Sequence, residues 1–154
     1  SPALIPREHP LYVVNDVFNA VFVKGNMLGN SMFYGSGAGK LPTASAVVAD
    51  IIEEAGHLDN HVSLGWSSEK LDIAPMEISC HKYFVRVSGP YEPKKQLIEQ
   101  CFGSCQIMTL EGLNECALLT EKMSEKQFKE ALFELEEKLG GMYQEVLQTI
   151  RAQL

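Results

Sequence analysis

A glycine-rich stretch, residues 34–50, constrains the fold of this chain more than any other feature. Three alternate glycines, Gly35, Gly37 and Gly39, follow a short apolar run that is typical of a strand. Pro42 and the alanines and aliphatic residues after it favour a helix, because proline is tolerated in the first helical turn. The stretch therefore predicts a strand, a tight turn and a helix.

The glycine turn has two interpretations. Glycines accept positive φ and lack a Cβ, so a ligand or another backbone segment can approach them closely. Unpaired N–H groups at a helix start, together with the helix dipole, favour a phosphate, a carboxylate or a polarised carbonyl. A tightly packed turn without a ligand explains the same spacing, so both interpretations stay open.

Two common phosphate-binding motifs are absent from the turn. A P-loop requires a glycine where Tyr34 stands and a hydroxyl residue where Leu41 stands. The dinucleotide fingerprint requires two residues between its last glycines, whereas only one residue separates Gly37 from Gly39. The turn therefore fits neither motif.

Three ordered blocks of residues carry a resemblance to a known family. They are residues 5–11, 17–23 and 32–50, and the last block contains the glycine turn. Over residues 2–55 the chain resembles homoserine dehydrogenase just beyond its catalytic region. The resemblance implies the C-terminal part of an oxidoreductase that interconverts L-homoserine and L-aspartate 4-semialdehyde with NADP or NAD, in threonine and methionine biosynthesis.

The same resemblance implies roles for individual residues. Gly39 matches the family's contact to the nicotinamide cofactor, with Gly37 and Ala38 beside it and Thr43 at the helix start. The nucleotide-binding fold and the catalytic lysine of the family precede the matched segment, so no residue here inherits a catalytic role. The fragment alone is expected to be inactive and to need the N-terminal half of the same enzyme. The alternative function is a free-standing regulatory module that binds a small molecule such as an amino acid and has no chemistry of its own.

The sequence predicts two domains, residues 1–76 with a linker at their end and residues 77–154. The elements predicted in the second domain are a strand at 82–88, a helix from 93, strands at 106–110 and 115–120, a helix at 124–139 and a strand at 146–150. This βαββαβ order is the ferredoxin-like arrangement, which makes the whole chain α+β, with a β-hairpin and helix in front. It resembles the ACT-type domain of many homoserine dehydrogenases and implies an amino-acid effector. The loop at 89–94 departs from the Asp-x-Pro-Gly of that family.

The last predicted helix has clear local signals. Ser124 and Gln127 form a capping box at its start. Glu125 and Lys129 stand four residues apart, which predicts an ion pair on the outer face of the helix.

Composition limits the partners and the location. The net charge is −7 and the basic residues are scattered, which argues against nucleic-acid binding. No apolar run approaches the roughly 20 residues that span a bilayer, and no leader pattern is present. We therefore expect a soluble, cytoplasmic protein with neither a membrane nor a nucleic-acid partner.

The four cysteines, Cys80, Cys101, Cys105 and Cys116, contain no C-x-x-C pair. A metal site that also uses His81 is conceivable, but zinc-type spacing is absent. Buried free thiols are the preferred interpretation, and no metal is predicted. Free thiols also suit a reducing compartment.

The helix predicted at 42–55 has an aliphatic stripe and a face of small residues. This is more apolar surface than one hairpin can cover, and such patches favour association. Unpaired sheet edges in the second domain add to this tendency. We predict a symmetric homodimer. The alternative is a monomer in which the loop at 57–76, with Trp66, folds back over the stripe.

Overall fold

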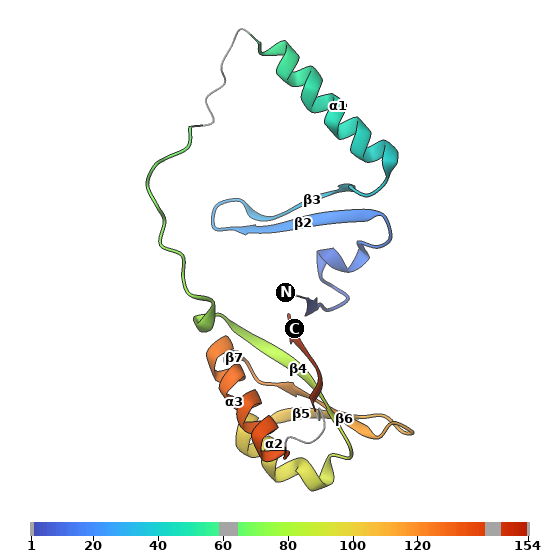
Figure 1. The fold of residues 1–154 in the computed structure, drawn as a ribbon, viewed down its shortest axis with the longest axis vertical. Coiled ribbons are helices and arrows are strands. Elements are labelled where there is room, and N and C mark those ends of the chain that lie inside the picture. Colours follow the sequence, from blue (N-terminus) through green and yellow to red (C-terminus); the bar gives the residue numbers. More distant parts are fainter. Residues whose placement is uncertain (1, 59–64, 141–145, 154) are drawn as a thin grey trace. The chain divides into compact units, whose positions relative to one another are not determined.

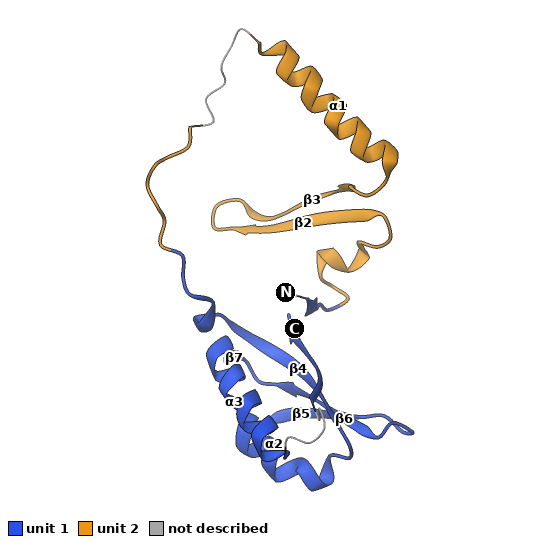
Figure 2. Ribbon diagram, viewed as in Figure 1, with its two compact units in different colours: residues 1–6, 73–154 blue, residues 7–72 orange. Residues whose placement is uncertain are grey.

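The computed structural model describes residues 2–58, 65–140 and 146–153. The chain forms two compact units (Figure 2). One comprises residues 7–72, and the other comprises residues 1–6 with 73–154, here called the C-terminal unit. Within the described ranges, none of the helices combines the length and the apolar character needed to cross a membrane.

The C-terminal unit is built on a sheet with two helices on one face (Figure 1). Its main elements are β4 (Cys80–Ser88), α2 (Lys95–Phe102), β5 (Cys105–Thr109), β6 (Glu115–Thr120), α3 (Glu125–Lys138) and β8 (Val146–Ala152). These four strands lie in the order β8-β4-β6-β5, with antiparallel neighbours. Strands β4 and β5 are therefore the two strands of a βαβ unit with β6 between them, and the predicted order βαββαβ is observed.

Smaller elements complete this unit. They are β1 (Ala3–Leu4), the 3-10 turns η2 (Met76–Ile78) and η3 (Glu92–Lys94), and β7 (Met123–Ser124), which pairs with the start of β4. The predicted capping box is confirmed at the start of α3. Ser124 Oγ accepts from the N–H of Gln127, and the Gln127 side chain accepts from the N–H of Ser124.

The core lies between the helices and one face of the sheet. Tyr83, Val85 and Val87 alternate with less buried residues along β4, as expected for a strand covered on one face. They belong to one cluster with Ile98 of α2 and Leu135 of α3, both 0% exposed. The helical stripes predicted from the sequence thus form this core.

The first residues of the chain belong to this unit as well. Strand β1 pairs in parallel with β8, with Ala3 opposite Arg151, and the N–H of Gln153 donates to the carbonyl of Leu4 at 2.8 Å. The three prolines within residues 1–16 predict an extended lead-in. That prediction is wrong for residues 3–4 and for the 3-10 turn η1 (Pro10–Val13), because a strand of two residues and a turn of four carry no periodic signal.

The other unit contains the predicted strand, turn and helix. Strands β2 (Phe18–Gly25) and β3 (Gly29–Ser36) form an antiparallel hairpin, and α1 (Lys40–Gly56) follows. The rings of Phe18 and Tyr34 stack across the hairpin at 5.0 Å. Helix α1 begins two residues earlier than predicted.

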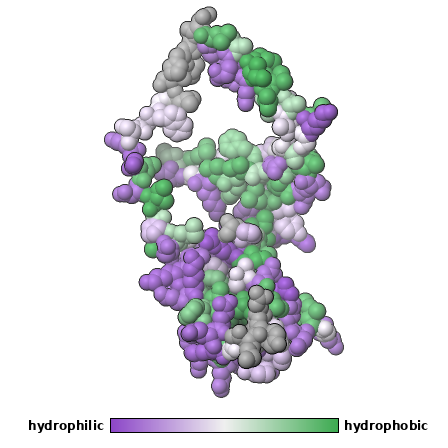
Figure 3. Space-filling model, in the orientation of Figure 1, coloured by the Kyte–Doolittle hydropathy of each residue, from purple (hydrophilic) through white to green (hydrophobic). Residues whose placement is uncertain are grey.

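No described residue of this hairpin-and-helix unit is buried. Apolar residues are visible on α1 and on the hairpin (Figure 3). On α1 the aliphatic stripe is at least half exposed, with Ile51 at 62% and Ile52 at 66%. In the loop, Trp66 is 87% exposed.

Candidate functional site

The predicted cofactor site lies between the end of β3 and the start of α1. Gly39 precedes the helix and has φ 123° and ψ 154°, a conformation that is almost restricted to glycine. Its carbonyl accepts the first helical hydrogen bond, from the N–H of Thr43 at 3.1 Å. The backbone therefore requires glycine at this position independently of any ligand.

The positive end of the α1 dipole is not neutralised by a nearby acidic side chain of the helix. Among the described residues no side chain caps it, and its first turn contains no acidic residue. The N–H groups in the first turn of a helix have no acceptor within that helix. Pro42 has no backbone N–H, so it contributes no donor. The N–H groups of Lys40 and Leu41 therefore have no partner within the helix, and the charge of Lys40 adds to the positive end of the dipole. This arrangement favours an anionic or polarised oxygen.

The other glycines of the turn differ in the space around them. A Cβ on Gly37 would lie 2.8 Å from Nδ2 of Asn19, whereas a Cβ on Gly35 would meet nothing within 4 Å. A shallow hollow of about 340 Å³ lies against this end of the hairpin. Its lining is Asn19, Ala20, Val21, Phe33, Tyr34, Gly35, Ser36 and Gly37. The turn thus brings Gly37, Ala38, Gly39 and Thr43 together beside a hollow with an apolar floor.

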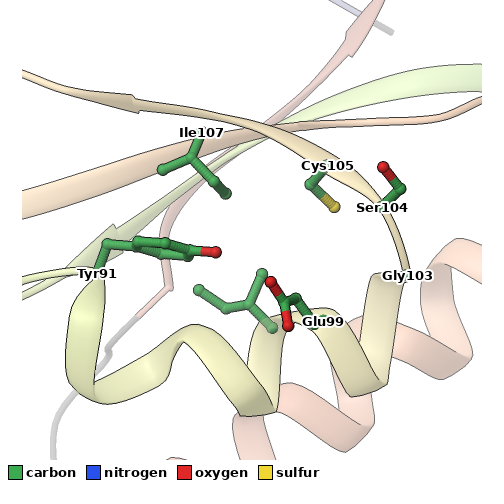
Figure 4. Close-up of a pocket in the computed structure, with 7 residues that line it drawn as sticks. Tyr91, Glu99, Gly103, Ser104, Cys105 and Ile107 are labelled. Carbon is green, nitrogen blue, oxygen red and sulfur yellow. The ribbon is translucent and has the colours of Figure 1, made fainter.

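A second hollow lies in the C-terminal unit, between the loop after β4, helix α2 and strand β5 (Figure 4). It has a volume of about 400 Å³ and is lined by Tyr91, Ile98, Glu99, Gly103, Ser104, Cys105 and Ile107. The Tyr91 hydroxyl, the Glu99 carboxylate and the Cys105 thiol point into it. This acidic hollow was missed by the sequence analysis, because its lining residues are spread over three elements.

The environment of the acidic hollow is electrostatically negative. Burial, followed by the charges of Glu121 and Glu99, raises the pKa of Cys105 to about 11. Burial and the nearby charges of Glu99 and Glu92 also raise the pKa of Tyr91. Both groups are therefore neutral at pH 7, and Glu99 supplies the negative charge, which favours a cationic group such as an ammonium.

The cysteines do not gather around a metal in the part of the chain that the structure describes, where no group of three or more potential ligands is found. Cys116 is buried, and Cys101 and Cys105 are partly buried, with pKa values raised chiefly by burial. Cys80 is exposed, so the prediction of a buried thiol is wrong there. Its position at the first residue of β4, before the covered part of the sheet, explains the difference.

A buried ionic cluster was also missed. Glu125, predicted on the outer face of its helix, is only 8% exposed. Its Oε2 accepts from the Tyr83 hydroxyl at 2.8 Å and from Nη2 of Arg151 at 2.6 Å. The predicted partner, Lys129, is present at 3.7 Å from Oε1. Spacing along the helix identified Lys129, but only the tertiary fold turns the first helical residue toward the sheet.

Burial and hydrogen bonding set the ionisation of this cluster. Burial alone would raise the pKa of Glu125, but hydrogen bonds from Tyr83 and Arg151 and the Arg151 charge outweigh it and lower that pKa. Burial, and then the hydrogen bond to Glu125, raises the pKa of Tyr83 to about 12. At neutral pH the cluster therefore holds an ionised carboxylate and a neutral phenol. An arginine in a mostly apolar last strand was the one sequence signal that could have indicated it.

The family model and the relatives that match this chain all name the same enzyme. The family model of homoserine dehydrogenase matches residues 1–52. Homoserine dehydrogenase from Neisseria gonorrhoeae is 34% identical over 153 residues, covering 88% of this chain and 35% of the relative. The enzyme from Bacillus subtilis is 29% identical over 168 residues, covering 99% of this chain and 38% of the relative.

Solved structures agree with the sequence relatives. The crystal structure of a homoserine dehydrogenase from Thiobacillus denitrificans is similar with a TM-score of 0.69 and 27% identity, covering 97% of this chain and 37% of that one. The α+β fold is thereby confirmed, and the chain spans a little over a third of the length of these relatives. The chain is similar over nearly its whole length to the C-terminal part of homoserine dehydrogenases.

Proposed function

We propose that this chain is the C-terminal part of an enzyme that interconverts L-homoserine and L-aspartate 4-semialdehyde with NADP or NAD. The observation that carries the proposal is the similarity of nearly the whole chain, 97% of it, to one part of a homoserine dehydrogenase structure. The family match over residues 1–52 includes the glycine turn, the open helix start and the beginning of α1. The proposed pathway is threonine and methionine biosynthesis in the cytoplasm.

The glycine turn is the proposed contribution of this chain to the complete site. Gly39 contacts the nicotinamide cofactor, Gly37 and Ala38 keep the approach free of bulky side chains, and Thr43 shapes the first helical turn. The unpaired N–H groups and the uncapped helix start support a contact to a polar or anionic part of the cofactor. The hydride chemistry belongs to the cofactor, so the role of these residues is binding and orientation.

Steady-state kinetics of the full-length enzyme test this role. Gly39→Val is expected to raise KM for NADP much more than KM for homoserine. Because Gly39 has a glycine-type backbone, a second variant, Gly37→Ala, avoids backbone strain, and its Cβ has only the end of the Asn19 side chain to displace. Gly35→Ala is the matched control, since its Cβ would enter open space. An unchanged cofactor KM in both test variants would leave the turn with a purely structural role.

The 154-residue chain by itself is proposed to lack the activity, because the family's nucleotide-binding fold and catalytic lysine lie before the matched segment. The purified chain should therefore not oxidise NADPH in the presence of aspartate semialdehyde. Adding the N-terminal half of the enzyme as a separate chain is the positive control. Turnover by the purified chain alone would contradict the proposal.

A second candidate function is the binding of an amino-acid effector by the C-terminal unit. The acidic hollow favours it, because Glu99 can pair with an ammonium group while Ile98 and Ile107 provide apolar walls. Methyl NMR shifts of these two isoleucines, followed during titration with a panel of amino acids, test the proposal. Saturable shifts that Glu99→Gln removes and Glu111→Gln, on the β5–β6 turn, retains would support it. Shifts that persist in Glu99→Gln would place the ligand elsewhere.

A further inference from the structure

The two segments that lead from the C-terminal unit to the other unit are both held near one side chain. The first segment is residues 1–6, whose strand β1 pairs with β8 at Arg151 and Ala152. The second begins at residue 73, and in it Met76 Sδ lies 3.6 Å from Nη2 of Arg151. Arg151 therefore contacts the N-terminal segment through its backbone and the linker through its guanidinium.

Glu125 connects the same two segments from the helix side. Its backbone N–H donates to the carbonyl of Ser79 at 2.9 Å, just after the 3-10 turn η2. Its carboxylate accepts from both Nε and Nη2 of Arg151, at 3.2 and 2.6 Å. Pro2 lines a cavity of about 360 Å³ together with Tyr83, Glu125 and Phe128, among others. Both segments thus rest against the Glu125–Arg151 pair.

The pair is shielded enough to hold its geometry. The side chains of Arg151 and Glu125 are 21% and 11% exposed, and the Tyr83 ring behind them stacks on Phe128 at 3.7 Å. Both arginine nitrogens donate to one oxygen, Oε2, and a low local dielectric strengthens such charge-assisted hydrogen bonds. The regular elements in the two segments are short, since β1 has two residues and η2 three.

We propose that the Glu125–Arg151 pair is a latch that fixes both chain connections onto the C-terminal unit and releases them together when it breaks. The βαββαβ core is held mainly by the apolar residues through which its helices and sheet meet, so loss of the pair weakens the core less than it weakens the two segments. Opening therefore frees residues 2–6 and 73–79 while the core stays folded. Since every covalent link between the two units passes through these segments, the state of the latch sets how firmly the C-terminal unit restrains the rest of the chain.

Amide hydrogen exchange of the 154-residue chain, measured by NMR, tests the latch. The N–H of Ser79 donates to Met76 and reports on the linker, whereas the N–H of Gln153 donates to Leu4 and reports on β1. In Arg151→Met both amides are expected to exchange about fivefold faster or more, and their exchange is expected to accelerate by a larger factor than that of the amide of Val85 in the core. Glu125→Gln, which preserves side-chain size, is expected to act in the same direction and decides the test if Arg151→Met does not fold.

The control variant is Arg86→Met. It removes the Arg86–Glu115 ion pair of the same sheet, in which Arg86 Nη2 lies 2.7 Å from Glu115 Oε2. It should leave both reporter amides unchanged. Faster exchange at only one reporter would show that the segments are held independently and would overturn the latch. Equal acceleration in Arg86→Met, or acceleration at Val85 by the same factor as at the reporters, would also overturn it, because the effect would then be general destabilisation.

Discussion

The two units of this protein use similar residues with opposite results for burial. In the C-terminal unit, Ile98 of α2 is 0% exposed, whereas Ile51 of α1 in the hairpin-and-helix unit is 62% exposed. Both isoleucines lie on amphipathic helices predicted from the sequence. The difference shows that an amphipathic pattern determines where an apolar face forms, while burial requires a second surface to close over it.

Matched truncations should give the largest contrast between the units. Ile98→Ala is expected to lower the free energy of unfolding by about 2–5 kcal/mol, because it opens a cavity in a packed core. Ile51→Ala removes the same atoms from an exposed position and is expected to cost less than about 0.5 kcal/mol. Urea denaturation of the two variants, at a dilution where the chain is monomeric, measures both values. A similar cost for the two at that dilution would mean that another part of the same chain covers α1.

Self-association is the next test of the uncovered unit. We predict a symmetric homodimer, because the exposed stripe of α1 and the apolar hairpin favour burial against a second copy. Light scattering over a tenfold dilution should give the mass of two chains, and Ile51→Glu should reduce it to one. Leu110→Glu, at a 69% exposed position of the other unit, is the control and should leave the dimer intact. A concentration-independent mass of one wild-type chain would contradict the prediction.

Acid should affect the C-terminal unit through Glu125. Its pKa is lower in the folded chain than the ordinary 4.5, so the unfolded chain binds the proton more readily. The stabilisation is therefore complete above about pH 4.5 and is lost as the pH falls through the folded pKa. Arg151, Lys129 and Tyr83 are the charged and titratable groups that face this carboxylate.

Denaturation of the wild type and of Glu125→Gln between pH 2 and 7 measures this effect. In Glu125→Gln, the free energy of unfolding should depend less on pH in the acid range. Glu115→Gln, which removes the carboxylate that pairs with Arg86, is the comparison. An acid profile identical to that of the wild type would show that Glu125 does not contribute.

High pH should also lower the stability of the C-terminal unit, in this case through Tyr83 of the same cluster. The pKa of Tyr83 rises from 10.0 to about 12 on folding, so its contribution is complete below pH 10 and is lost as the pH rises through 12. Tyr83→Phe should flatten the decline of stability over this range, as followed by urea denaturation. An unchanged slope would assign the alkaline loss to other groups.

The smallest expected effect is a difference in thiol reactivity. Cys80 is exposed, whereas burial and nearby carboxylates raise the pKa of Cys105 to about 11, which leaves little thiolate at neutral pH. Alkylation with iodoacetamide at pH 7.5, followed by mass spectrometry, should label Cys80 before Cys105. Labelling at equal rates would indicate that the C-terminal unit opens readily.

Local signals accounted for most of the elements. The capping box of Ser124 predicted the start of α3, and alternation around Val85 predicted the covered strand β4. Both signals act within a few residues, so they survive in an isolated sequence. The glycine turn was predicted for the same reason, since the conformation of Gly39 is nearly exclusive to glycine.

Contacts between distant residues were not predicted. The strand at Ala3 is created by a partner 148 positions away, since it pairs with Arg151. Glu125 looked like a surface residue because its helical spacing to Lys129 is local, whereas its bonds to Tyr83 and Arg151 come from two strands. The acidic hollow likewise combines Glu99 with residues from a loop and a strand.

The sequence by itself thus determined the order of the elements and the position of the glycine turn, because caps, periodicity and backbone preference act along the chain. Only the tertiary structure decided which apolar faces are buried and which charges are paired. The physical reason is that burial and ion pairing depend on surfaces that become neighbours only after folding. A helix such as α1 can therefore be fully specified in sequence and still lack the surface that would bury it.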